Sequence, residues 1–222
     1  MYFRMSIAAW ALMAFVAVCF AKERVIAVPF NDDLSLWTVE QMPGGSVVAK
    51  DGVLVIDDRN GCTVWMRQKL TAPVEITYEV KVVINGGPND RLSDINCFWM
   101  ASDPAAPGRP AGRSGKFADY DSLRLYYVGM GGNMNTTTRF RRYAGDGSKP
   151  LLTGYDLNGA DVLLTPNLTY HLRVVARDGV AEFWRDGKRI FSFKDPTPLT
   201  EGWFGFRTVR SHLEIRNFRI SR

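Results

Sequence analysis

Hydrophobic and polar residues alternate with a period of two along much of the chain. The clearest case is Val74–Ile84, where Val, Ile and Tyr occupy one parity and Glu, Thr and Lys occupy the other. This alternation is typical of an antiparallel strand with one buried face and one solvated face. Val180–Phe193 shows the same pattern on both sides of Asp186–Gly187, a dipeptide that favours a two-residue hairpin turn.

Several shorter segments have the same character, and no amphipathic helical pattern of useful length accompanies them. The further predicted strands are Val53–Ile56, Cys62–Met66, Leu123–Val128, Tyr170–Ala176, Gly202–Val209 and Leu213–Ile220. Many short strands separated by turn signals favour a β-sandwich or a β-barrel. The two longest stretches without a strand pattern are 103–119 and 144–159, and loops of this length are often functional.

The first residues have the pattern of a signal peptide. Arg4 precedes the apolar run Ile7–Phe20, and Ala21 ends it with a small residue. The run is short for a membrane span, although an uncleaved anchor is the alternative. We expect residues 1–21 to be a signal peptide, residues 22–222 to form a single domain, and the chain to be periplasmic or secreted without a membrane anchor after cleavage.

The charge balance is mildly basic, with 28 Lys and Arg against 23 Asp and Glu, a formal net charge of +5. No block of consecutive basic residues resembles a nucleic-acid-binding tail. An expected exported location also argues against a nucleic-acid partner. An acidic polymer outside the cytoplasm is the more natural partner.

Cysteine and acidic residues limit the metals and disulfides that can be expected. Cys62 and Cys97 both lie inside apolar strand patterns, so we predict two buried thiols rather than a disulfide. Too few Cys and His residues lie close together for a structural zinc site. No cofactor is expected otherwise, although calcium could be held by loop carboxylates. Those carboxylates are Asp32, Asp33, Asp119 and Asp121.

The most polar predicted strand is Asn133–Tyr143. One parity holds Thr137, Arg139, Arg141 and Tyr143, and the other holds Thr136, Thr138, Phe140 and Arg142. Neither parity is apolar enough for ordinary core, so this segment is predicted to form the floor of a binding groove. Guanidinium groups bind carboxylate or sulfate in a bidentate manner. The alternative is a charge ladder on a solvated face, paired with Asp and Glu of neighbouring strands.

A second polar segment precedes it. Asp94 and Asn96 share one parity with Phe98, whereas Trp99 lies on the other parity. A carboxylate and an amide within a strand are costly unless they are hydrogen-bonded. They either line the groove and bind sugar hydroxyls or form a buried structural network, and the sequence leaves both open.

Aromatic and histidine side chains complete the candidates. Tyr126, Tyr127, Tyr143, Tyr155 and Trp99 could stack on sugar rings or pack in the core. His212, beside Arg210 and Ser211, could act as a general base, or it could be an ordinary hydrogen-bonded residue at the start of a strand.

A family resemblance adds to this picture. It rests on Trp184–Lys188, Phe191–Asp195, Gly202–Thr208 and Leu213–Phe218, together with Ser93–Ala101, Tyr126–Asn133 and Thr137–Tyr143. These segments resemble a family of exported bacterial domains of unknown function (family 6250), similar to the YesU group associated with the use of pectin and rhamnogalacturonan. The resemblance covers most of the chain from about Phe30 onward. It implies an all-β, two-sheet antiparallel jelly-roll sandwich of the concanavalin A-like type and a carbohydrate context, without a reaction mechanism.

We therefore expect a protein that binds and degrades an acidic, uronate-containing polysaccharide. A lyase fits better than a glycoside hydrolase, because no Glu-x-Asp-x-Glu run supplies two close carboxylates on one strand face. The expected catalytic residues are Arg139, Arg141, Tyr143, Tyr127 and His212. The expected substrate-binding residues are Asp94, Asn96, Trp99, Tyr126, Asn133, Asn135, Thr137, Arg142 and Arg207. A non-catalytic carbohydrate-binding module is the alternative, and a structural jelly roll within a larger cell-surface complex is a third.

Overall fold

The computed structural model describes residues 24–31, 33–106 and 108–222. The expected signal peptide and Asp32, one of the proposed calcium ligands, lie outside the described residues. None of the described helices is long and apolar enough to cross a membrane.

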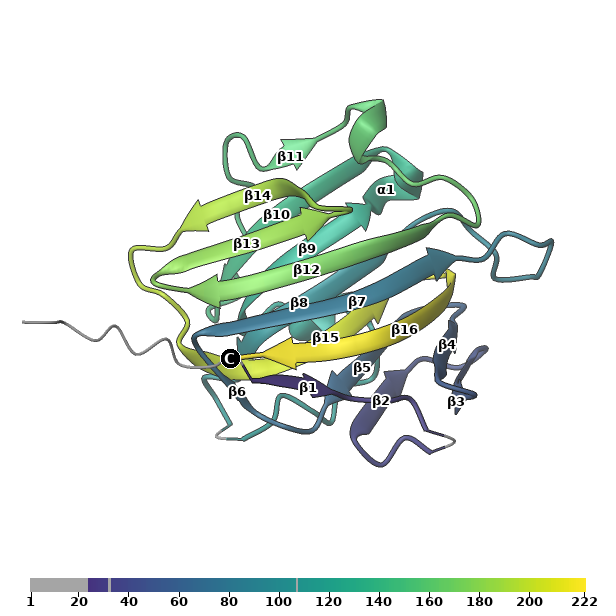
Figure 1. Cartoon of the computed structure of the whole chain (residues 1–222), viewed down its shortest axis with the longest axis horizontal. Coiled ribbons are helices and arrows are strands. Elements are labelled where there is room, and N and C mark those ends of the chain that lie inside the picture. The colour runs from purple at the N-terminus through teal and green to yellow at the C-terminus, as the bar shows by residue number, and fades with distance from the viewer. Residues whose placement is uncertain (1–23, 32, 107) are drawn as a thin grey trace, which may run out of the picture.

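Two antiparallel sheets form the structure, and Figure 1 shows their strands as two layers. Sheet 1 consists, in spatial order, of β14 (Lys188–Lys194), β13 (Val180–Arg185), β12 (Thr169–Arg177), β7 (Val74–Val82), β16 (His212–Ser221), β4 (Val53–Asp57) and β3 (Ser46–Lys50), with β1 (Val25–Ala27) also paired to β16. Sheet 2 consists of β11 (Asp156–Leu157), β10 (Thr137–Ala144), β9 (Arg124–Gly131), β8 (Ile95–Ser102), β15 (Glu201–Thr208), β5 (Cys62–Met66) and β2 (Trp37–Gln41), with β6 (Leu70–Thr71) also paired to β15. The predicted all-β architecture with two antiparallel sheets is confirmed.

Helical structure is limited to three short segments in the described residues. They are the 3₁₀ turns η1 (Phe117–Tyr120) and η2 (Ala160–Val162) and the short element α1 (Gly132–Asn135). The sequence pattern places residues 133–136 in a strand, and this is wrong, because β10 begins only at Thr137.

The main hydrophobic core lies between the sheets. The alternating strand β7 contributes Val74, Ile76, Tyr78, Val80 and Val82 to it, as its pattern predicts. Both cysteines are buried there as free thiols, which confirms the prediction for them.

A second, smaller hydrophobic cluster covers part of the other face of sheet 2. It contains Trp65, Phe98, Tyr127 and Tyr143 from the strands, and Tyr120 from the long segment that follows β8. This segment therefore packs against the outer face of sheet 2, the face directed away from sheet 1. The cavity described in the next subsection lies where this segment meets the strands of sheet 2.

Candidate functional site

A row of polar residues crosses the outer face of sheet 2 from strand to strand. The antiparallel registers align Arg139 of β10 with Gly129 of β9, Gly129 with Asn96 of β8, and Asn96 with Arg207 of β15. Residues aligned in this way have side chains on the same face of the sheet. The arginine strand and the segment of Asp94 and Asn96 thereby lie on the same face of sheet 2, separated by the single strand β9.

A cavity of about 370 Å³ opens above this row. The volume lies within the range of about 300–1,000 Å³ that is usual for small-ligand pockets. Its lining consists of Arg91, Asp94, Asn96, Phe117, Tyr127, Gly129, Gly132, Asn133, Thr137, Arg139, Arg141, Tyr143, Lys149 and Val209. Phe117 and Lys149 come from the two long loops, so both loops contribute to its walls.

The basic side chains of the cavity differ in how their charge is compensated. Arg139 forms a two-pronged pair with Asp156, with nitrogen–oxygen distances of 3.1 and 3.2 Å. Lys149 binds both carboxylate oxygens of Asp121 at 2.6 Å. Arg141 donates to the main-chain carbonyl of Lys149, and among the described residues no carboxylate forms an ion pair with it. Arg141 is therefore the cavity arginine best able to accept an anion from outside.

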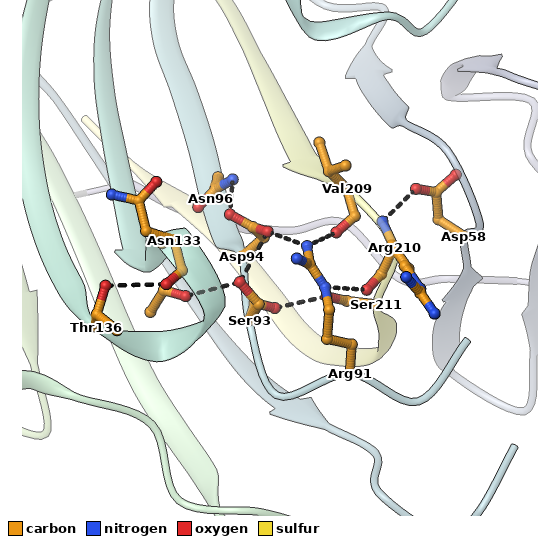
Figure 2. A network of polar contacts seen from close by, with 12 residues as sticks. Asp58, Arg91, Ser93, Asp94, Asn96, Asn133, Thr136, Val209, Arg210 and Ser211 are labelled. Carbon is orange, nitrogen blue, oxygen red and sulfur yellow. Dashed lines mark hydrogen bonds and ion pairs between the residues drawn. The ribbon is translucent and has the colours of Figure 1, made fainter. Parts of the chain in front are cut away.

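Asp94 belongs to a compact hydrogen-bond network at one end of the cavity (Figure 2). Its Oδ2 accepts hydrogen bonds from Arg91 Nη2 at 2.5 Å and from Ser93 Oγ at 2.8 Å. Arg91 also donates from Nε to the carbonyl of Arg210 at 2.9 Å. Burial raises the pKa of the Asp94 carboxyl above its usual range, and hydrogen bonds from Ser93 and Asn96 and the charge of Arg91 oppose this shift. The network fixes Asp94 at the cavity wall, whereas burial favours the neutral form of its carboxyl more than water would.

The hydroxyl of Tyr127 lies over Gly129 at the centre of the row. A side chain at position 129 would overlap the Tyr127 Oη atom, so only glycine leaves room for the phenol. Burial raises the pKa of Tyr127 well above its usual value. Burial likewise raises the pKa of Tyr143, whose hydroxyl has no hydrogen-bond partner. Both phenols therefore stay protonated near neutral pH, and each has an O–H group that could donate to a ligand.

A left-handed turn forms the rim of the cavity between β9 and β10. Asn133, Met134 and Asn135 have φ values of 52°, 58° and 59°, a conformation that is costly for residues other than glycine and least so for asparagine. The Asn135 side chain closes the turn by bonding both the amide and the carbonyl of Leu164, at 2.8 and 2.9 Å. Asn133 is thereby presented at the cavity, while Met134 is exposed to solvent.

A larger hollow of about 630 Å³ lies on the outer face of sheet 1, around Trp184. Several of its polar groups already have partners within the protein: Arg173 pairs with Glu75 at 3.3 Å and stacks at 4.0 Å on the Trp184 ring, and His171 lies 3.6 Å from Glu79. The Trp184 indole donates to Glu182 at 2.9 Å. We therefore place the candidate site in the cavity on sheet 2, despite its smaller volume.

Comparison with known proteins assigns the chain to a family. The model of the family described as Domain of unknown function (DUF6250) matches residues 56–218. The chain belongs to the DUF6250 family. No curated protein sequence matches the chain significantly.

Solved structures similar to this DUF6250 member share its jelly-roll fold. A Bacillus subtilis protein of unknown function with a galectin-like fold has a TM-score of 0.61 at 18% identity, covering 83% of this chain and 88% of that one. The carbohydrate-binding module CBM66 of Bacillus subtilis has a TM-score of 0.56 at 14% identity, covering 86% and 99%. A prokaryotic β-1,3-1,4-glucanase (lichenase) from a mouse hindgut metagenome has a TM-score of 0.57 at 13% identity, covering 89% and 98%. These likenesses establish the fold, and the predicted jelly roll is confirmed.

Most of the predicted site residues surround the cavity. They are Asp94, Asn96, Tyr127, Asn133, Thr137, Arg139, Arg141 and Tyr143. Their chemical roles stay predictions. Asn135 does not line the cavity and instead closes the left-handed turn.

Three predicted binding residues lie elsewhere, because they are directed toward sheet 1. Trp99 is buried in the main core, where its indole donates to the Val175 carbonyl at 3.3 Å. Tyr126 donates to Asp195 at 2.8 Å, and Arg142 pairs with the same carboxylate at 3.2 Å. None of the three can reach a ligand in the cavity without a rearrangement of the core.

Two further predicted residues also lie outside the cavity. His212 stands at the start of β16 in sheet 1, and its Nδ1 lies 3.1 Å from Asp90. It is therefore placed as a hydrogen-bonded residue of the other sheet, the alternative left open by the sequence. Arg207 belongs to the polar row but is completely buried beneath the long loop.

Phe117, Lys149 and Arg91 line the cavity but are not among the residues predicted from sequence. The only sequence signal for the first two was the length of their loops. Arg91 lies three residues before Asp94, and its role becomes visible only when the bend at Asp94, with φ of 61°, turns the two side chains toward each other.

Proposed function

We propose that the protein binds a polysaccharide with acidic sugar residues, and that the cavity on sheet 2 holds one such residue. The single observation that carries this proposal is Arg141, a cavity guanidinium without a carboxylate partner among the described residues. Arg139, Arg91 and Lys149 also line the cavity, and each of these cations is paired with a carboxylate of the protein. A carboxylate-bearing ligand would supply the missing counter-charge through charge-assisted hydrogen bonds.

The remaining lining is suited to a sugar. Asn96, Asn133, Thr137 and Tyr127 provide donors and acceptors for hydroxyl groups, and Phe117 offers an aromatic ring on the wall. Proteins of the same fold include a carbohydrate-binding module and a β-glucanase, which supports a saccharide ligand. The expected signal peptide would bring the chain to the compartment where such polymers occur.

We expect Arg141→Ala to weaken binding of oligogalacturonate about 10- to 100-fold, because a hydrogen bond to a charged group contributes about 1.5–3 kcal/mol. Isothermal titration calorimetry with the acidic oligosaccharide and its carboxyl-reduced, neutral counterpart measures the effect. The loss should be confined to the acidic ligand.

Arg216→Ala is the matched control, because Arg216 is an exposed arginine of sheet 1 that pairs with Glu214. It should leave both affinities unchanged. An Arg141→Ala protein that binds the acidic oligosaccharide as tightly as the unaltered protein would remove Arg141 from the proposal.

Elimination at a uronate is the second candidate function, favoured by the two tyrosine hydroxyls beside the cationic groups. In this reaction a base removes the proton on the carbon next to the carboxylate. The bond to the leaving glycosidic oxygen breaks, a carbon–carbon double bond forms, and the leaving oxygen takes up a proton. Among the lining residues Asp94 is the one carboxylate, so the paired carboxylates of common glycosidases are missing there.

The raised pKa of Tyr127 predicts how the rate of this reaction should depend on pH. If its phenolate is the base, the turnover rate at saturating substrate should rise continuously with pH from neutral to alkaline conditions, because the reactive fraction increases tenfold per unit below the pKa. Ultraviolet absorbance of the unsaturated product follows the rate. A profile with a plateau near neutral pH would exclude a Tyr127 phenolate, and no absorbance at any pH with retained binding would favour a binding module.

A further inference from the structure

Arg207 is a charged side chain with an unusual environment. It is completely buried, and its Nη1 donates to the Gly115 carbonyl at 2.5 Å and to Thr63 Oγ1 at 3.2 Å. Its Nε and Nη2 atoms have no hydrogen-bond partner. The rings of Phe117 and Tyr120 each lie 5.1 Å from its guanidinium carbon. Of the five N–H groups of a guanidinium, the three on Nε and Nη2 are thus shielded from solvent without being satisfied.

The charge of Arg207 lacks a direct counter-ion. Among the described residues no carboxylate forms an ion pair with it, although Asp58 acts on it from a greater distance. Burial lowers the pKa of Arg207, which reflects the cost of holding a cation away from water. Cation–π contacts offset only part of this cost. A buried charge of this kind is retained either because it holds a structure together or because it binds something.

The unsatisfied atoms are not confined to Arg207. Asn96 Oδ1 and Tyr143 Oη are also buried without partners, and both residues line the cavity. Asn96 is the cross-strand neighbour of Arg207 on the same face of sheet 2. Phe117 both lines the cavity and contacts the guanidinium. The Phe117 ring therefore covers Arg207 on the side of the cavity.

We propose that Arg207 is a second anion-binding subsite, which becomes continuous with the cavity when the Phe117 ring moves aside. The proposal rests on the proposed function in one respect, since the anion would be an acidic group of the same saccharide. Nε and Nη2 of Arg207 would donate hydrogen bonds to the acidic group, and Asn96 Oδ1 would accept a hydrogen bond from a neighbouring hydroxyl group of the saccharide. The ligand would satisfy the atoms that the free protein leaves without partners.

The competing explanation is that Arg207 only anchors the loop through Gly115. The two explanations predict opposite effects of Arg207→Met on stability. A binding role leaves an uncompensated charge in the free protein, so methionine, of similar length, should raise the thermal unfolding midpoint. An anchoring role predicts that the midpoint falls, because the bond to the loop is lost. A midpoint that falls or does not rise overturns the proposal.

A double-mutant cycle tests the subsite itself, with sulfate as the probe because it does not depend on the identity of the saccharide. Phe117→Ala should bind sulfate at least about tenfold more tightly than the unaltered protein, a change of about 1.4 kcal/mol. Phe117→Ala combined with Arg207→Met should lose this gain. Phe117→Leu serves as the milder replacement if the alanine variant does not fold, and the same dependence on Arg207 is expected.

The two proposals can fail separately. An unchanged or weaker sulfate affinity in the Phe117 variants, or a gain that persists with Arg207→Met, overturns the Arg207 subsite and leaves the role of Arg141 untouched. Conversely, a sulfate gain that depends on Arg207, without binding of oligogalacturonate by any variant, keeps the anion subsite and overturns the acidic-saccharide ligand.

Discussion

Trp99→Ala is expected to lower the free energy of unfolding by about 3–5 kcal/mol, the usual range for removing a large aromatic side chain from a core. Trp99 is completely buried between the sheets, with ring centroids of Tyr126 and Phe140 at 5.5 and 5.9 Å. The substitution leaves a cavity among these rings and also removes the hydrogen bond to the Val175 carbonyl. Urea denaturation monitored by circular dichroism measures the loss.

Trp99→Phe keeps part of the packing and should cost less than the alanine variant. Because the Trp99 side chain faces away from the cavity, the folded fraction of either variant should bind oligogalacturonate with nearly unchanged affinity. An alanine variant with normal stability and abolished binding would instead return Trp99 to the binding site, as the sequence analysis first suggested.

Gly129→Ala should weaken the binding of oligogalacturonate about tenfold or more, although the substitution adds only a single methyl group. The new side chain would overlap the hydroxyl of Tyr127. Tyr127 cannot easily retreat, because the rings of Phe98, Phe117 and Tyr143 surround it at 5.7–5.9 Å. The phenol would therefore leave the centre of the polar row, and a lost hydrogen bond together with the unsatisfied group costs about 1–3 kcal/mol. Calorimetric titration of the purified variant measures this loss.

Gly132→Ala is the matched control, because Gly132 also lines the cavity but its added side chain would meet Thr137 only at ordinary contact distances. It should bind nearly as well as the unaltered protein. Equal losses in both glycine variants would show that the cavity floor tolerates no added methyl group, and they would argue against a specific role of the Tyr127 hydroxyl.

The sheet architecture could be predicted because strand alternation is a local property of the sequence. In β7 every apolar residue of the pattern is buried between the sheets. In β10 the alternation was interpreted correctly for only one of the two faces of the strand. The parity of Arg139 and Arg141 does face the cavity, but the other parity is core. Phe140 is completely buried there, and Arg142 is accommodated by its pair with Asp195.

The misplacement of Trp99 and Tyr126 has a different origin. Their aromatic rings suggested stacking on sugars. Trp99, however, shares its strand parity with Cys97, and Tyr126 shares its parity with Val128, and this parity faces the core. Parity was the better guide, since a β-strand rarely turns a single side chain to the opposite face. Phe117 and Lys149 were beyond sequence reasoning, because the path of a long loop depends on tertiary contacts such as the hydrogen bond from Tyr120 to Glu40 at 2.7 Å.

The two cysteines carry a practical consequence for anyone who works with the protein. Burial raises the pKa of the Cys97 thiol to about 12 and also raises that of Cys62, so neither supplies much of the reactive thiolate at neutral pH. Both cysteines are enclosed in the core between the two sheets, and neither lines the cavity on sheet 2. Alkylation of either sulfur thus requires the two sheets to separate. The rate of alkylation therefore reports on transient opening of the sandwich, independently of ligand binding in the cavity.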